Sequence, residues 1–243
     1  FLYHFKLKFQ ITIMSDKKVH VEESNEVVHK IEGFWKKNQK QLLIVVGAIV
    51  VIVGGWFGYQ SMVVAPKEQQ ASEAIYKAEG NFAKDSLRLA LNGDGSSKGF
   101  LYIINNYSGT KSANLAKYYA GLCYLRTGDF NNAVKYLGDF STDAKQVQMM
   151  AYGALGDAYG ELNKNDDAVA SYKKAAATFE DDEASASEFL FRAGLKLEIM
   201  GKTSEAVDVY KEVKDKFPQT DKGFLAEKYI YRLSVQPNDF SSK

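Results

Sequence analysis

The residue types that usually carry catalysis are sparse in this chain. All three histidines precede an uncharged apolar stretch that begins at Gln41; they are His4, His20 and His29. The region after that stretch therefore contains no imidazole that could act as a general base. Acidic runs at Asp166–Asp167 and Asp181–Glu183 stand at predicted turns, where helix N-capping and solvation explain them better than a metal site. We expect neither an enzyme nor a cofactor or metal protein.

Two further features could suggest chemistry. The loop 92–97 (NGDGSS) has the composition of a calcium-binding loop but lacks the rest of the ligand series and the closing Glu, so we expect a flexible turn. Cys123 is the only cysteine, which excludes an intramolecular disulfide. Because it lies among close-packed residues at 121–124, it is predicted to be a buried small hydrophobe and not a reactive thiol.

Composition sets the class of the fold. Hydrophobic residues make up 46% of 243 residues, which is ample for a core. Thirty-one Lys and Arg balance 30 Asp and Glu, so no strong positive field would attract nucleic acid. Three prolines against 19 glycines favour helices joined by short turns. The predicted class is all-α.

The apolar stretch predicts one transmembrane helix at residues 41–63. Eleven Leu, Ile, Val and Phe side chains lie between Leu42 and Gly58, and they contribute roughly 3 to 7 kcal/mol of insertion free energy. Trp56 and Tyr59 fall at the end of the span, where amphipathic rings favour the headgroup region. Gly54 and Gly58 are a G-x-x-x-G pair that could contact another transmembrane helix, although glycine is common in such helices.

Charges beside the span predict its orientation. Lys36, Lys37 and Lys40 precede it, whereas only Lys67 beside Glu68 follows it, so the positive-inside rule places the N-terminus in the cytoplasm. A polar segment precedes the span and no clear cleavage site follows it, which favours an uncleaved anchor over a signal peptide. The predicted address is the bacterial inner membrane, single pass, with the remainder in the periplasm.

The segment before the span is expected to have two parts. Met14 opens an ordinary polar N-terminus, so residues 1–13 are interpreted as a non-native or upstream-start extension. Residues 14–40 form the predicted cytoplasmic tail. Val27, Val28, Ile31, Phe34 and Trp35 recur there at helical spacing and predict an amphipathic helix that lies on the inner leaflet or, less favourably, docks a partner.

The region after the span contains an internal repeat. Gly121, Gly156 and Gly194 each stand twelve residues before an alanine, namely Ala133, Ala168 and Ala206. The glycines are 35 and 38 residues apart, and a turn follows each at 127–129, 163–165 and 201–203. We expect each small pair to let two helices of one unit pack closely.

These residues resemble the tetratricopeptide repeat family. The middle unit matches best, with Tyr152, Leu155, Gly156, Tyr159, Ala168, Tyr172 and Ala175 at the family's spacings. The first unit departs from the pattern at Lys117, Leu137 and Phe140. The resemblance implies an α-solenoid of helical hairpins over residues 111–235, including a closing helix at 223–234. Residues 64–110 would form a linker helix and a degenerate opening repeat, with helices at 69–91 and 99–107, and residues 236–243 a tail.

The resemblance also implies a concave face that binds proteins or peptides, lined by the first helix of each unit. The predicted inward residues mix apolar and charged side chains; they are Tyr118, Leu122, Arg126, Asp157, Glu161, Phe191, Leu195 and Glu198. The alternative is that individual members of this set only support neighbouring helices.

The whole order of segments is similar to the YfgM-like family, through the stretch Phe34–Asn38 (FWKKN), a span ending at Gly55–Trp56, and an Ala-rich helix leading into repeats. This resemblance implies an ancillary subunit of the Sec translocon that works beside a membrane-anchored periplasmic chaperone and assists secreted proteins. Two alternatives are a scaffold for envelope assembly or division, and a non-catalytic subunit of an enzyme complex.

Overall fold

The structure is a computed structural model that describes Trp35 and residues 37–235. The all-α prediction is confirmed: within this part of the chain the only β pairing is an isolated bridge between Gly93 and Lys98. The chain divides into two compact units at Met62 and Val63, and each unit is considered by itself. The extension 1–13, the predicted amphipathic helix at 27–35 except Trp35, and the tail 236–243 lie outside the described residues.

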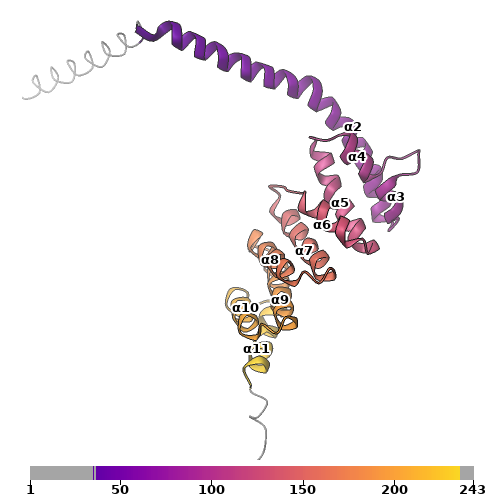
Figure 1. Ribbon diagram of the computed structural model, residues 1–243, viewed down its shortest axis with the longest axis vertical. Coiled ribbons are helices and arrows are strands. Elements are labelled where there is room, and N and C mark those ends of the chain that lie inside the picture. The colour runs from indigo at the N-terminus through magenta and orange to yellow at the C-terminus, as the bar shows by residue number, and fades with distance from the viewer. Residues whose placement is uncertain (1–34, 36, 236–243) are drawn as a thin grey trace, which may run out of the picture. The chain divides into compact units, whose positions relative to one another are not determined.

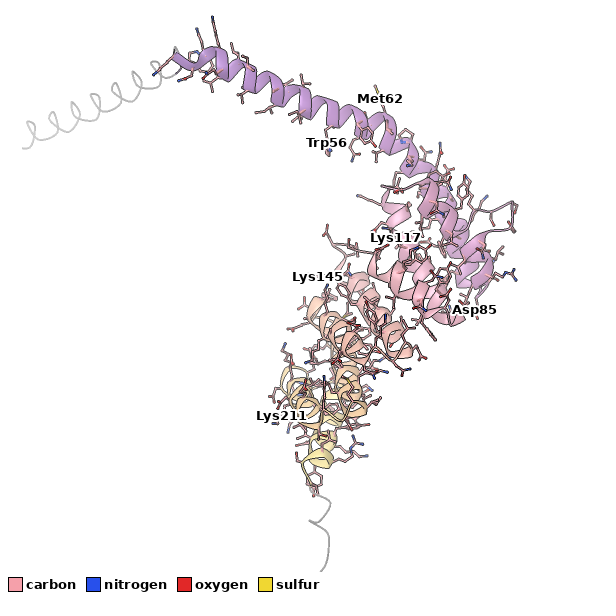
Figure 2. All side chains as sticks on the ribbon, in the orientation of Figure 1. Trp56, Met62, Asp85, Lys117, Lys145 and Lys211 are labelled. Carbon is pink, nitrogen blue, oxygen red and sulfur yellow. The ribbon has the colours of Figure 1, made fainter. Side chains whose placement is uncertain are left out.

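A single continuous helix, Lys37–Ala83, contains the apolar stretch. Its most apolar 18-residue window has a mean hydropathy of 2.4, and none of that window is buried. By length and composition this is a helix able to cross a membrane. Figure 2 shows Trp56 and Met62 projecting from this helix, and both side chains are exposed.

The helix changes geometry just after the apolar stretch. Residues Gln60–Val64 form a π-helical turn (η1), and α2 (Ala65–Ala83) follows directly, with Pro66 in its first turn. In a regular α-helix the proline ring would clash with the carbonyl of Met62, four residues earlier. The π-helical turn thus lies directly before the proline, where regular α-helical hydrogen bonding would be interrupted.

The opening segment differs in detail from the sequence expectation. Instead of one helix over 69–91, α2 ends at Ala83 and a separate short helix, α3 (Leu87–Asn92), follows. The chain breaks at Lys84–Ser86, where Asp85 adopts a positive φ of 58°. After the loop 93–99, α4 (Phe100–Asn106) completes the segment, and Ala71, Ala74, Ile75 and Ala78 of α2 form its buried face.

Three helical hairpins and a closing helix follow in succession (Figure 1). The hairpins are α5 (Lys111–Thr127) with α6 (Phe130–Gly138), α7 (Lys145–Glu161) with α8 (Asn165–Thr178), and α9 (Glu183–Ile199) with α10 (Thr203–Lys216); the closing helix is α11 (Asp221–Ser234). Each helix packs on the next one along the chain. This stacked-hairpin arrangement confirms the predicted fold class.

Local sequence explains where these helices begin and end. The side chains of Thr110, Asp129, Asp182 and Thr220 each accept a hydrogen bond from the backbone N–H three residues later, which caps α5, α6, α9 and α11. The predicted capping role of the 181–183 acidic run is thereby confirmed at Asp182. Gly128 and Gly201 take positive φ at the turns between paired helices, a conformation that glycine adopts without steric cost.

Close contact between paired helices depends on the repeated glycines. A Cβ placed on Gly121 would lie 2.5 Å from Cγ of Leu137, and one on Gly156 would lie 2.6 Å from Cε1 of Tyr172. Gly194 meets Tyr210 in the same way at 2.5 Å. The nearest neighbour is therefore the side chain sixteen residues later, and not the alanine twelve residues later that the sequence suggested. The three alanines are themselves fully buried.

Candidate protein-binding cleft

Asp157 on α7 joins three helices. The hydroxyl of Tyr172 on α8 donates to Asp157 Oδ1 at 2.6 Å, and Nη1 of Arg192 on α9 donates to the same oxygen at 3.0 Å. Burial and the bond to Asp157 raise the pKa of Tyr172 above its ordinary value, so its hydroxyl stays a donor. Asp157 was predicted to face a ligand, but its carboxylate already fixes the second unit to the third.

Glu198 on α9 has the analogous role one unit later. It accepts hydrogen bonds from the Tyr210 hydroxyl on α10 and from Nη2 of Arg232 on α11. Burial and the bond to Glu198 raise the pKa of Tyr210 as well. In both cases a tyrosine of the second helix and an arginine of the next element share one carboxylate of the first helix.

The first unit replaces the polar pair with an apolar one. Leu122 and Leu137 stand 35 residues before Asp157 and Tyr172, and Leu137 is buried while Leu122 packs partly buried beside it. The two leucines occur together for a physical reason: a carboxylate or a hydroxyl alone at this half-buried contact would have no hydrogen-bond partner. Leu195 takes the Asp157 position in the third unit, where the acid has moved one turn along to Glu198.

A surface cleft of about 450 Å³ crosses the first helices of all three units. Leu125 of α5 and Phe130 of α6 line one part of it, and Glu161 of α7 and Lys196 of α9 line another, together with Asp157 and Tyr172. Neither Glu161 nor Lys196 forms an ion pair with any described residue. The cleft thus offers an apolar region beside two uncommitted, opposite charges.

The remaining predicted inward residues are engaged within the stack. Tyr118 packs on Phe140 with ring centroids 5.3 Å apart, and Arg126 forms a 2.6 Å ion pair with Asp85. Phe191 is only 2% exposed and lies against Tyr210 and Tyr229. Its side chain belongs to the core, because the closing helix covers it.

Of the eight predicted residues, the cleft brings together Asp157 and Glu161. It also uses four that were not among the predicted inward residues, namely Leu125, Phe130, Tyr172 and Lys196. Leu125 directly precedes the predicted Arg126, and Lys196 directly follows the predicted Leu195, so each is one position away from a residue that was predicted to face inward. Gly54 and Gly58 lie in the other compact unit, and a Cβ on either would meet nothing within 4 Å.

The other features with chemical potential are accounted for locally. Four hydrogen bonds from Ser96 and Ser97 converge on Asp94 Oδ1 and hold the pKa of Asp94 at about 2, so its carboxylate is used inside the turn. Cys123 is buried as predicted, and burial raises the pKa of its thiol to about 12. Within the part of the chain that the structure describes, no group of three or more His, Cys, Asp or Glu side chains could hold a metal ion.

Comparison with known families identifies the hairpins. Models of the tetratricopeptide repeat match residues 115–143, which span α5 and α6, and residues 154–220, which run from α7 to the turn before α11. No curated protein and no solved structure matches the chain. The predicted repeat family is confirmed on both segments.

Proposed function

We propose that this chain, a tetratricopeptide repeat protein, uses the cleft across its first helices to bind an extended segment of a partner protein. Repeats of this kind serve protein–protein interaction, and stacking them creates a continuous surface along which a peptide can lie. The observation that carries the proposal is the cleft itself, since residues from α5, α7 and α9 all line it.

The lining of the cleft selects the chemistry of the bound segment. Leu125 and Phe130 would bury an apolar side chain, whereas Glu161 and Lys196 would pair with a basic and an acidic group of the partner. Asp157 would contribute little, because Arg192 and Tyr172 already satisfy it. The preferred ligand is therefore a segment with an apolar residue near charges of both signs.

The finer proposal concerns location and partners. The exposed apolar helix would anchor the repeats in the bacterial inner membrane, with the repeats in the periplasm, and the clients would be secreted proteins emerging from the Sec translocon. What supports this is the order of the segments, with lysines before the span and repeats after it, and the apolar, unburied window of the helix.

Site-specific crosslinking in the full-length protein tests both the binding cleft and the proposed partners. A photoreactive amino acid would replace Glu161 in one variant and, as a control, Lys211 on the outer surface of α10 (Figure 2) in another. We expect crosslinks to client segments from Glu161 only. We also expect translocon subunits among the co-purified proteins. Clients without translocon subunits would reject the finer proposal and keep the cleft, whereas equal crosslinking from both positions would reject the cleft.

Charge reversal gives a second, independent readout. Glu161→Lys and Lys196→Glu are each expected to weaken client binding by about tenfold through loss of one ion pair and gain of one repulsion. Lys211→Glu should leave binding unchanged. Undiminished binding in both cleft variants would contradict the proposal.

A further inference from the structure

The closing helix α11 presents an exposed face with mixed aromatic and charged character. Phe224, Glu227, Lys228 and Tyr231 recur at i, i+3, i+4 and i+7, so they lie on one side of the helix. Phe224 and Tyr231 are each 67% exposed, although side chains of this size are usually buried. Among the described residues no element follows α11 to cover them.

Comparison within the chain shows what such a face does elsewhere. Helices α5 and α11 share a constant offset of 110 residues: Thr110 and Thr220 cap them identically. Tyr119 and Tyr229 both pack on an aromatic ring of the helix immediately before, namely Phe100 of α4 at 5.3 Å and Tyr210 of α10 at 5.2 Å. The two helices therefore sit in the stack in the same register.

On α5, the four positions equivalent to the exposed face all contact α6 or the loop after it. Asn114 bonds Ser141 O at 2.7 Å, Lys117 bonds Asp139 O at 3.2 Å, Tyr118 packs on Phe140, and Gly121 meets Leu137. The exposed face of α11 thus occupies the position of a helix-packing face. Tyr231 replaces the glycine of Gly121, so a following helix in the repeat geometry could not approach it.

We propose that the α11 face packs against the same face of a second copy of this chain, with the two helices antiparallel about a two-fold axis between Glu227 and Lys228. The order of residues along the face is self-complementary in this arrangement. Phe224 of each copy meets Tyr231 of the other, and Glu227 meets Lys228. An isologous contact of this kind requires a face that matches itself.

The charges of the face are available for this contact. Lys228 forms no ion pair with any described residue. Glu227 is bonded to Lys214 at 2.9 Å, but both side chains are exposed. Exposed pairs contribute little stability, so Glu227 can exchange partners at small cost. Four aromatic side chains burying on the order of 150 Å² each would give a small interface, which indicates a weak dimer.

Photo-crosslinking of the full-length protein in lipid vesicles tests the proposal. The photoreactive p-benzoylphenylalanine replaces Phe224, and unlabelled protein is mixed with ¹⁵N-labelled protein so that contacts between copies are distinguished by mass. The control carries the same residue at Tyr76, an exposed aromatic of α2. We expect crosslinks from position 224 to the 228–233 segment of the other copy, and none from position 76.

Charge-swap variants complete the test in the same assay. Glu227→Lys or Lys228→Glu alone places like charges across the axis and should lower the crosslinked yield several-fold, while the two together restore it. Tyr231→Ala should lower it at least about tenfold. An equal yield from Tyr76, crosslinks only to other proteins, or a double variant that fails to recover would overturn the proposal. Circular dichroism of each variant checks that the helices persist.

Discussion

Single residues decide how closely the helices of one unit approach. Gly121, Gly156 and Gly194 have ordinary helical backbones, so their role is not conformational freedom but the absence of a Cβ. The ring of Tyr172 cannot swing away from Gly156, because its hydroxyl is held by Asp157. A methyl group at this position must therefore move the whole helix α8.

Gly156→Ala should accordingly lower the free energy of unfolding by about 1–3 kcal/mol. Gly80→Ala is the matched control, because Gly80 lies inside α2 and a Cβ there would meet nothing within 4 Å. That control should raise stability by about 0.5–1 kcal/mol through helix propensity. Chemical denaturation of both variants measures the difference, and an equal effect of the two would contradict the role of close contact.

The shared carboxylate of Asp157 gives a second prediction for single residues. Tyr172→Phe removes one donor while Arg192 still satisfies Asp157, so we expect a loss of about 1 kcal/mol. Asp157→Ala leaves the half-buried Tyr172 hydroxyl without its acceptor and the Arg192 guanidinium with Glu188 as its remaining partner, and it should cost about 2 kcal/mol. Tyr136→Phe is the control: Tyr136 stacks on Tyr124 at 5.5 Å and its hydroxyl bonds no described residue. Urea unfolding curves should show this ranking.

Between elements, two side chains of α2 bind at or just before the start of α5, the first helix of the first repeat. Glu68 accepts hydrogen bonds from the backbone N–H of Lys111 at 2.6 Å and of Ser112 at 2.9 Å, and from the Ser112 hydroxyl. Lys67 beside it bonds Ser108 O at 3.0 Å. A carboxylate from α2 thus satisfies orphan donors in the first turn of α5, 43 and 44 residues away.

The contact between Glu68 and the first turn of α5 should weaken in acid. Burial alone would raise the pKa of Glu68, but the bonds from Ser112 and Lys111 outweigh it and lower that pKa. A lowered native pKa contributes stability at neutral pH that is lost as pH falls below the ordinary glutamate value of about 4.3 and through the native one. The protection factors of the Lys111 and Ser112 amides, which compare their exchange with the intrinsic rate at the same pH, should therefore fall in acid. Glu68→Gln should show low protection factors at these two amides at neutral pH already, with little further change in acid.

The sequence predicts regular spacing well and particular partners poorly. The hairpins and their turns follow from glycines at 35- and 38-residue intervals. The break at Lys84–Ser86 does not, because it contains neither glycine nor proline and depends on packing of α3 against α5. Asp157 and Phe191 were expected in the groove. Asp157 instead pairs with Arg192 of the next unit, and Phe191 is covered by the closing helix. Both partners lie 35 or more residues further along the chain, so local spacing does not reveal them.

At the scale of the whole molecule, the unburied apolar window and the flanking lysines are the observations behind the proposed membrane anchor. The exposed Leu, Ile and Val side chains of residues 43–53 would be unfavourable in water, since a patch of this length greatly exceeds what soluble proteins expose. A bilayer removes that cost. In the proposed arrangement, the three lysines before the apolar stretch would oppose transfer of the N-terminal side across the membrane.

Cysteine labelling tests this orientation. The parent chain should resist maleimide until it is denatured, because Cys123 is buried and its thiol pKa is about 12. In cells with a permeabilised outer membrane, an impermeant maleimide should label a Lys211→Cys variant but label a Lys40→Cys variant only after lysis. Both substituted lysines are exposed in the structure. The reverse pattern would invert the orientation. Labelling of both variants before lysis, or of neither, would mean that residues 41–63 do not separate the two positions by a membrane.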